Sequence, residues 1–329
     1  MIEHRAWHWI LLVVVFGVVC VAGIASGAVA IPVNEVIRAI GGSGDESVIA
    51  IVRNLRLPRV ALAALVGAGL GMSGGALQGT LRNGLAEPYL LGVSGGAAVG
   101  AVVAFSIGAS AEGWIALAAF AGAAVAVVLA LLVARAAGRG GRGDPRTLLM
   151  AGVVIGAFAN AVIMIALANA PPNTIRGALW WMMGSAGDAT WSGVSVLSLS
   201  LLAGGAALVY LARDIDVLAL GEEPAAALGV DVDRAARAIY LLSALLAAAT
   251  VAAAGLVGFV GLIVPHLVRS AGVRRHRPLL IGAALVGATL VVAADLAARV
   301  LRPPAELPLG AVTAVLGVPF FLAQLRKTS

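Results

Sequence analysis

The sequence predicts an all-α membrane protein that crosses the bilayer about ten times, with one short, broken helix. Of its 329 residues 61% are hydrophobic and 12% are charged, about half the charged share of a typical soluble domain. Uncharged stretches such as Trp9–Ala30 and Leu117–Ala134 approach the roughly 20 apolar residues that cross a bilayer core. We therefore expect residues 1–329 to form a single transmembrane domain.

Ten apolar segments are long enough, or nearly so, to be spans. In chain order they are Trp9–Ala30, Val60–Gly79, Leu90–Gly108, Trp114–Arg135, Thr147–Ala168, Gly193–Ala212, Arg237–Ala254, Val257–Val268, Leu279–Ala298 and Leu309–Leu325. Glycines repeat every fourth residue in the second span and the third, which favours close contact between helix backbones. These glycines are Gly67, Gly71 and Gly75, then Gly92, Gly96 and Gly100.

The eighth segment is too short for an ordinary span. Arginines stand before Ala238 and after Val268, and if both groups face the cytoplasm, an even number of crossings separates them. Two full spans need about 40 residues, more than this stretch offers. We expect one full helix and one short helix inside the bundle, broken near three glycines (Gly255, Gly258 and Gly261) and ending at Pro265 and His266.

The distribution of basic residues predicts the orientation. With both termini in the cytoplasm, fifteen of the 22 Lys and Arg fall in inner loops and seven in outer loops, as the positive-inside rule requires. The outer seven are Arg38, Arg53, Arg56, Arg59, Arg176, Arg299 and Arg302. On this orientation residues 32–59 form an outer, periplasmic loop, and the protein lies in the cytoplasmic (inner) membrane.

The sequence argues against several chemistries. The sequence has no basic stripe with interleaved aromatic residues, the pattern that would indicate nucleic-acid binding. No glycine-rich loop precedes Lys327, the only lysine, so ATP, if it is used, must bind to another chain. The four histidines lack zinc-ligand spacing. Only Asp295 is acidic within a predicted span, where an ion pair with Arg299 one turn later is expected; this scarcity disfavours, without excluding, an ion-coupled secondary carrier.

Four segments carry recognisable motifs: Leu55–Arg59 (LRLPR), Gly75–Gly96 (GALQGTLRNGLAEPYLLGVSGG), Leu218–Val230 (LALGEEPAAALGV) and Gly258–Arg269 (GFVGLIVPHLVR), followed by Ala305–Gly310 and Gly317–Phe320. Taken together and in order, they resemble the FecCD family of ABC importer permeases over nearly the whole chain. One departure is Gly84, where the family usually has proline. The resemblance implies a homodimer of ten-helix subunits with type II ABC importer architecture.

The resemblance also implies partners. Two ATP-binding cassette ATPase subunits, which hold ATP and magnesium, would lie on the cytoplasmic side, and a periplasmic or lipid-anchored substrate-binding protein outside; this chain would need no cofactor. Residues 218–230 are too short and polar to span; alone they read as an interfacial loop, but the family makes them the loop that couples to the ATPase. Its matched residues are Leu218, Ala219, Leu220, Gly221, Glu222, Glu223, Ala226, Leu228 and Gly229.

Two further sets of residues gain expected roles. Arg56, Arg59 and Arg299 match family positions that face acidic side chains of the binding protein, although lipid headgroups could also hold them. The pathway would be lined by the fifth, eighth and tenth spans and by the loop from Trp180 to Trp191, with Asn160, Met164 and Met183 among its residues. Plain helix packing is the alternative for these three.

The expected cargo is a metal chelate. A ferric siderophore is the first choice on frequency within the family, cobalamin follows because Trp181–Gly184 (WMMG) resembles a loop of the vitamin B12 permease, and heme is third. A secondary carrier and a membrane receptor or scaffold without transport remain as alternatives from other classes.

Overall fold

A bundle of long helices makes up the structure, a computed structural model that describes residues 3–27, 29–109, 111–137 and 145–328. Within these ranges the backbone is helical with turns and loops and has no strand. Seven helices are long and apolar enough to cross a membrane, and three shorter apolar helices, α5, α13 and α15, lie where spans were predicted. The predicted class, an all-α polytopic membrane protein, is confirmed.

The helices match the ten predicted spans in order. The corresponding helices are α1 (Glu3–Ala25), α4 (Leu57–Thr80), α5 (Val93–Ser106), α6 (Glu112–Ala137), α7 (Pro145–Ala168), α9 (Trp191–Tyr210), α12 (Val232–Ala254), α13 (Val260–Ser270), α14 (His276–Val300) and α15 (Leu309–Thr328). Shorter helices connect them: α2 (Val33–Gly41), α3 (Glu46–Ala50), the 3₁₀ turn Pro88–Leu91, α8 (Pro172–Met182), α10 (Ala212–Leu218) and α11 (Glu222–Ala227).

Most of the segment 32–59, which was predicted to be an outer loop, is helical. α3 continues through a π-helical stretch, Ile51–Arg56, into α4, so one continuous helix runs from Glu46 to Thr80 and begins well before the predicted start at Val60. Pro58 has no N–H for the carbonyl four residues earlier, and the π turn next to it accommodates this interruption.

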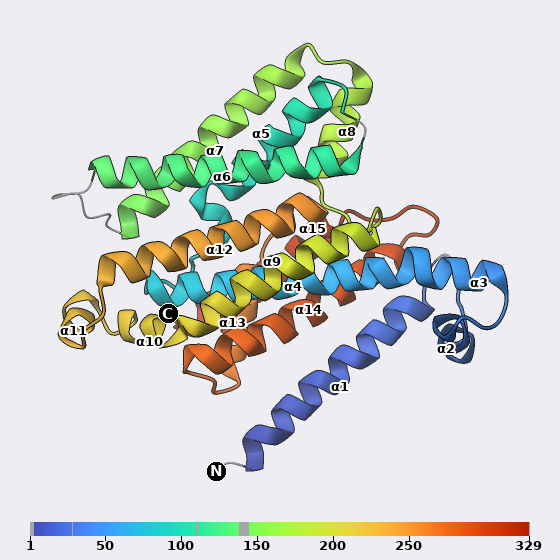
Figure 1. The fold of residues 1–329 in the computed structure, drawn as a ribbon, viewed down its shortest axis with the longest axis horizontal. Coiled ribbons are helices and arrows are strands. Elements are labelled where there is room, and N and C mark those ends of the chain that lie inside the picture. Colours follow the sequence, from blue (N-terminus) through green and yellow to red (C-terminus); the bar gives the residue numbers. More distant parts are fainter. Residues whose placement is uncertain (1–2, 28, 110, 138–144, 329) are drawn as a thin grey trace.

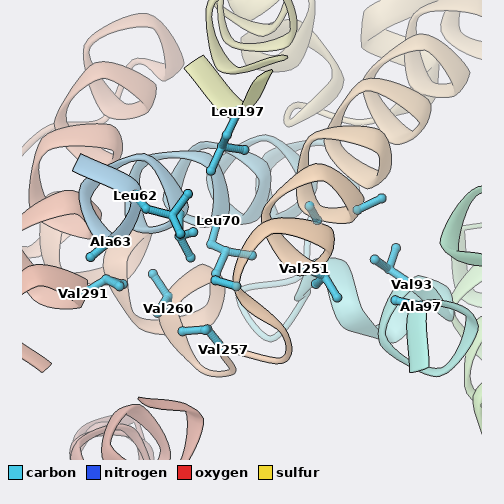
Figure 2. Packing of buried hydrophobic residues seen from close by; sticks show 14 of the residues in the cluster. Leu62, Ala63, Leu70, Val93, Ala97, Leu197, Val251, Val257, Val260 and Val291 are labelled. Atoms are coloured by element: carbon cyan, nitrogen blue, oxygen red, sulfur yellow. The ribbon is translucent and has the colours of Figure 1, made fainter. Parts of the chain in front are cut away.

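α4 is the central helix and the most deeply buried of the long spans. It packs against α14, α12, α13 and α9, while α5, α6, α7 and α8 form a second group that α12 joins to the first. Figure 1 shows these two groups one above the other, with α1 diverging from the bundle towards its N-terminal end. Small and branched side chains from both groups, among them Leu70, Val93, Val251 and Val260, fill one continuous core (Figure 2).

The repeated glycines are where helix backbones touch. A Cβ at Gly67 would overlap the carbonyl of Gly287 in α14, and one at Gly287 would overlap that of Gly67. The same reciprocal arrangement joins Gly96 in α5 to Gly122 in α6. The predicted close approach is therefore confirmed at these two crossings, where no larger residue fits. Gly92, predicted to lie on a face of the third span, instead stands before α5 with φ +82°, and Gly75 meets leucine side chains of α14.

The chain breaks between α12 and α13, as predicted, at Gly255 (φ +69°) and at Phe259, a non-glycine residue with φ +67°. The backbone groups freed by the break have side-chain partners. Tyr89 Oη donates to the carbonyl of Val257 (3.1 Å) and accepts from its N–H (3.0 Å), and Glu87 Oε1 accepts from the N–H of Phe259 (2.9 Å).

The expected end of the short helix at Pro265 and His266 is wrong, because α13 continues to Ser270 with Pro265 inside it. Proline lacks the N–H that would bond the carbonyl of Gly261. Gln78 of α4 replaces this donor, with Nε2 3.2 Å from the Gly261 oxygen and 3.1 Å from the Leu262 oxygen. A helix interior tolerates this proline because a neighbouring side chain satisfies the carbonyl.

Candidate functional site

Four charged side chains form an ion cluster at the end of the bundle where α4 begins and α14 ends. Asp295 is 1% exposed and accepts from Arg59 Nε (2.9 Å to Oδ1) and from Arg299 Nε (3.1 Å to Oδ2). Arg59 also donates to both oxygens of Glu306, at 2.9 and 2.8 Å. This second pair lies at the surface, and the hydrogen bond from Arg59 lowers the pKa of Glu306, which lies in the loop after α14.

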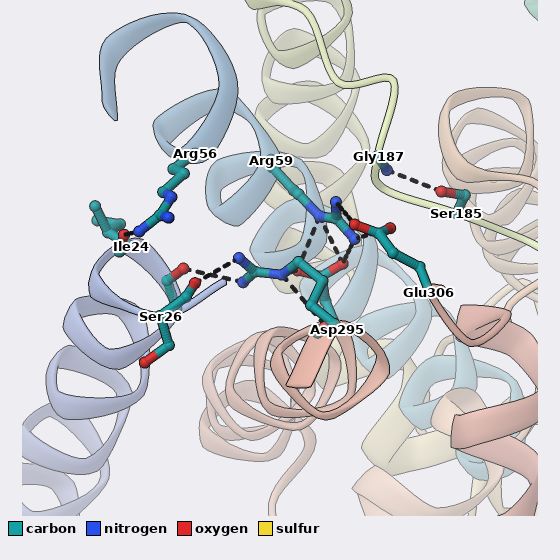
Figure 3. Close-up of polar contacts among 10 residues, drawn as sticks. Ile24, Ser26, Arg56, Arg59, Ser185, Gly187, Asp295 and Glu306 are labelled. Carbon is teal, nitrogen blue, oxygen red and sulfur yellow. Dashed lines mark hydrogen bonds and ion pairs between the residues drawn. The ribbon is translucent and has the colours of Figure 1, made fainter. Parts of the chain in front are cut away.

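Two arginines tie α1 to this cluster. Arg56 donates to the carbonyls of Ile24 (2.7 Å), Ala25 (2.8 Å) and Val29, and Arg299 donates to those of Gly23 and Ser26, both at 2.9 Å. These carbonyls belong to the last turn of α1 and the residues after it, where a helix leaves its C=O groups without intrahelical donors. Figure 3 shows the guanidinium group of Arg56 directed at Ile24 in this helix end.

The arginines expected to meet a binding protein are therefore engaged within the chain. Arg56 is 8% exposed and Arg299 7%, and all three bond to carbonyls or carboxylates. A direct contact with an external acidic group requires one of these bonds to open. Arg59 is the best placed of the three, since its partner Glu306 is itself exposed.

The sequence predicted one ion pair of the cluster and missed the others. The pair between Asp295 and Arg299, one helical turn apart, is confirmed. The contacts of Arg59 join residues 236 and 247 positions apart, and local spacing does not reveal such pairs. The only available signal was that a lone acidic residue in one span must find a positive partner at the same depth.

At the opposite end of the bundle, residues 218–230 form a helical corner made from the end of α10 and from α11. Leu218 and Ala225 are buried and belong to a small core with α4, α12 and α14. Leu220 and Leu228 point outward, 65% and 61% exposed, beside the exposed Glu222 and Glu223. Gly221 adopts φ +121° between the two helices, a conformation that a side chain would strain.

This corner is attached to α14 as well. Asp216 of α10 accepts two hydrogen bonds from His276 at the start of α14, from its N–H at 2.9 Å and its ring Nδ1 at 2.7 Å. The His276 ring lies against Gly79 near the end of α4. Packed side chains and this partly buried polar contact therefore connect the corner to α4 and α14.

The three expected pathway residues do not form one cluster within this subunit. Asn160 and Met164 lie on the exposed side of α7, Met164 with 72% of its surface accessible. Met183 follows α8, and its carbonyl accepts from the N–H of Gly310 at the start of α15, as the Gly184 carbonyl does from Leu309. The loop around Met183, the break before α13 and the start of α15 therefore meet at one place.

Asn160 interrupts an otherwise apolar face of α7, whose exposed residues include Val153, Val154, Phe158 and Ile165. An amide group facing hydrocarbon without a partner costs several kcal/mol, of the order of 2–7. An exposed amide at this depth is therefore favoured only where protein or water, and not lipid, lies against it.

The fold is that of the permease subunit of an ATP-binding-cassette importer. A metal-chelate type ABC transporter solved in an inward-facing conformation superposes with a TM-score of 0.85 at 28% identity, over 96% of this chain and 97% of that one. Residues 11–327 match the FecCD transport family. The chain belongs to this family, as the sequence motifs indicated.

Relatives with assigned cargoes are similar over most of their length. A cobalamin import permease of Halobacterium salinarum is 43% identical, covering 84% of this chain and 73% of its own. A hemin transport permease of Yersinia pestis is 42% identical over 82% and 81%, and an iron(III)-citrate import permease of Bacillus subtilis is 34% identical over 96% and 94%. Their cargoes share a metal held in an organic ligand.

Proposed function

We propose that the chain is the translocation subunit of an importer for one metal chelate, and that two copies form the pathway between them. The class of cargo is supported by the relatives, which are named for cobalamin, hemin and iron(III)-citrate. The exposed face of α7 has Asn160 in an otherwise apolar surface. Such a weakly polar surface suits the wall of a pathway through which a large chelate passes without being bound tightly. A ferric siderophore remains our first choice of cargo.

The proposal for energy coupling rests on the corner at residues 218–230. Its inward side is anchored in the core, while its outward side presents two exposed leucines and two carboxylates at an aqueous end of the bundle. Exposed apolar side chains in such a position indicate a protein partner. We assign this surface to the ATPase subunits. On this proposal this end of the bundle and both termini face the cytoplasm, and the protein lies in the inner membrane.

The ion cluster at the other end is proposed to face the substrate-binding protein. An acidic side chain of that partner can replace Glu306 on Arg59, because Glu306 is exposed and the guanidinium needs no other rearrangement. Arg56 and Arg299 keep their carbonyl partners and add positive charge nearby. Such complementarity acts mainly on orientation and association rate.

The test of coupling is the double variant Leu220→Ser/Leu228→Ser, which leaves the buried anchors intact. The permease should still be inserted and monodisperse but should no longer co-purify with the ATPase, and ATP-driven uptake should fall at least tenfold. The matched control is Ile107→Ser/Leu301→Ser, two residues at the opposite end that are at least as exposed, 79% and 69%. Unchanged ATPase binding in the first variant, or equal loss in the control, would show that the corner is not the docking site.

A further inference from the structure

A groove of about 750 Å³ opens between the N-terminal half of α1 and the turn that joins α13 to α14. Its walls are almost entirely apolar and include Leu12 of α1, Leu267 of α13 and Val286 of α14. Trp9 lies against Gly282 and closes one side. The groove exists because α1 is held to the bundle at its outer end, by Arg56 and Arg299, and diverges from α14 towards its N-terminus (Figure 1).

The length of the groove matches one leaflet of a bilayer. From Arg275, at the start of α14, to Val286 is eleven residues along the helix. At 1.5 Å per residue this is about 16 Å, close to half of the roughly 30 Å hydrocarbon core. The mouth therefore lies at headgroup level and the far end near the bilayer midplane.

The mouth is positively charged. Arg274 and Arg275 line it and are exposed, and Arg277 follows one residue into α14. Within the described part of the chain, no carboxylate pairs with these three guanidinium groups, whereas Arg59 and Arg299 at the other end are both paired. His8 also lines the mouth. An acyl chain fits the apolar wall, and a negatively charged group fits the rim.

We propose that this groove is a binding site for one anionic phospholipid, with its headgroup on Arg274 and Arg275 and an acyl chain along Leu12, Leu267 and Val286. The bound lipid completes the packing of α1 against α14 at the end away from the Arg56 and Arg299 contacts. The proposal requires only that the protein spans a membrane and is independent of the cargo and of the ATPase.

The experiment is native mass spectrometry of the purified full-length permease, titrated with phosphatidylglycerol and phosphatidylcholine of identical acyl chains. Two arginines near a net negative headgroup predict a preference of roughly tenfold for phosphatidylglycerol. Arg274→Gln/Arg275→Gln should abolish the preference. The matched control, Arg234→Gln/Arg237→Gln, removes two other arginines at the same end, away from the groove, and should keep it.

Two further measurements distinguish binding in the groove from attraction of the headgroup to surface charge alone. Val286→Phe fills the apolar wall and should reduce retention of phosphatidylglycerol at least threefold with the arginines in place. A hundredfold excess of sn-glycerol 3-phosphate should not displace the lipid. Equal retention of the two lipids by the unaltered protein, no effect of Val286→Phe, or displacement by the soluble phosphate would overturn the proposal.

Discussion

Replacing Asp295 by asparagine is the most severe perturbation that the ion cluster offers. The carboxylate is 1% exposed and accepts from two arginines. Asparagine in its place leaves Arg299 with carbonyl partners only and Arg59 with Glu306 as its single carboxylate, so two neighbouring guanidinium groups lose the buried negative charge between them. Removing one partner of a buried ion pair costs about 3–5 kcal/mol, since the remaining charge is uncompensated.

Glu306 provides the internal comparison. It bonds the same arginine but its side chain is 42% exposed, and exposed pairs contribute about 0–1 kcal/mol. Thermal unfolding in a fixed detergent should therefore show a melting temperature lowered on the order of 5–10 °C for Asp295→Asn but by about 2 °C or less for Glu306→Gln. Unfolding must be compared at one scan rate, because membrane proteins of this size unfold irreversibly.

A double variant tests the reason for the loss. With Arg59→Met added to Asp295→Asn, one of the two stranded charges is gone and Arg299 keeps its two carbonyl partners. The combined loss should be smaller than the sum of the single losses. Strict additivity, or an Asp295→Asn variant as stable as Glu306→Gln, would refute the view that the carboxylate compensates two buried charges.

Three further outcomes are expected. Gly67→Ala forces the backbones of α4 and α14 apart, at a cost of about 1–3 kcal/mol, and should lower the yield of monodisperse protein, whereas Gly17→Ala, which has open space around it, should not. Gln78→Leu leaves the Gly261 carbonyl without its donor and should lower stability by about 1–3 kcal/mol, measured by thermal unfolding. The pKa of Glu306 is lowered in the folded state, so its stabilising contribution is complete above the ordinary glutamate value of about 4.3 and is lost as the pH falls through the lowered value. Unfolding temperatures of the unaltered protein and of Glu306→Gln should accordingly converge on acidification from pH 5 to pH 3; a constant gap would contradict the assignment.

Residues 238–268 show what the sequence could predict and what it could not. Charge distribution and the available length required one full helix and one short helix, and both are present. The end of the short helix was misplaced because proline was treated as a local stop. The rescue of the freed carbonyl comes from Gln78, 183 residues earlier, and nothing in the local pattern specifies it.

The ion cluster likewise contains contacts that the sequence predicted and contacts that it did not. The helical pair of Asp295 with Arg299 follows from i,i+4 geometry and was expected. The contacts of Arg59 and the binding of the α1 carbonyls depend on how α1, α4 and α14 pack together, and so required the structure. The continuation of α4 back to Glu46 was hidden by the polar residues of the segment, which in sequence resemble a loop.

Transport in liposomes tests the central claim most directly. The purified permease is reconstituted with and without its ATPase and binding protein, and uptake of a metal chelate carried by that binding protein is followed. Accumulation should require ATP, the ATPase and an intact corner at residues 218–230, and should be absent with the permease alone under a proton or sodium gradient. Uptake by the permease alone, driven by such a gradient, would contradict the account.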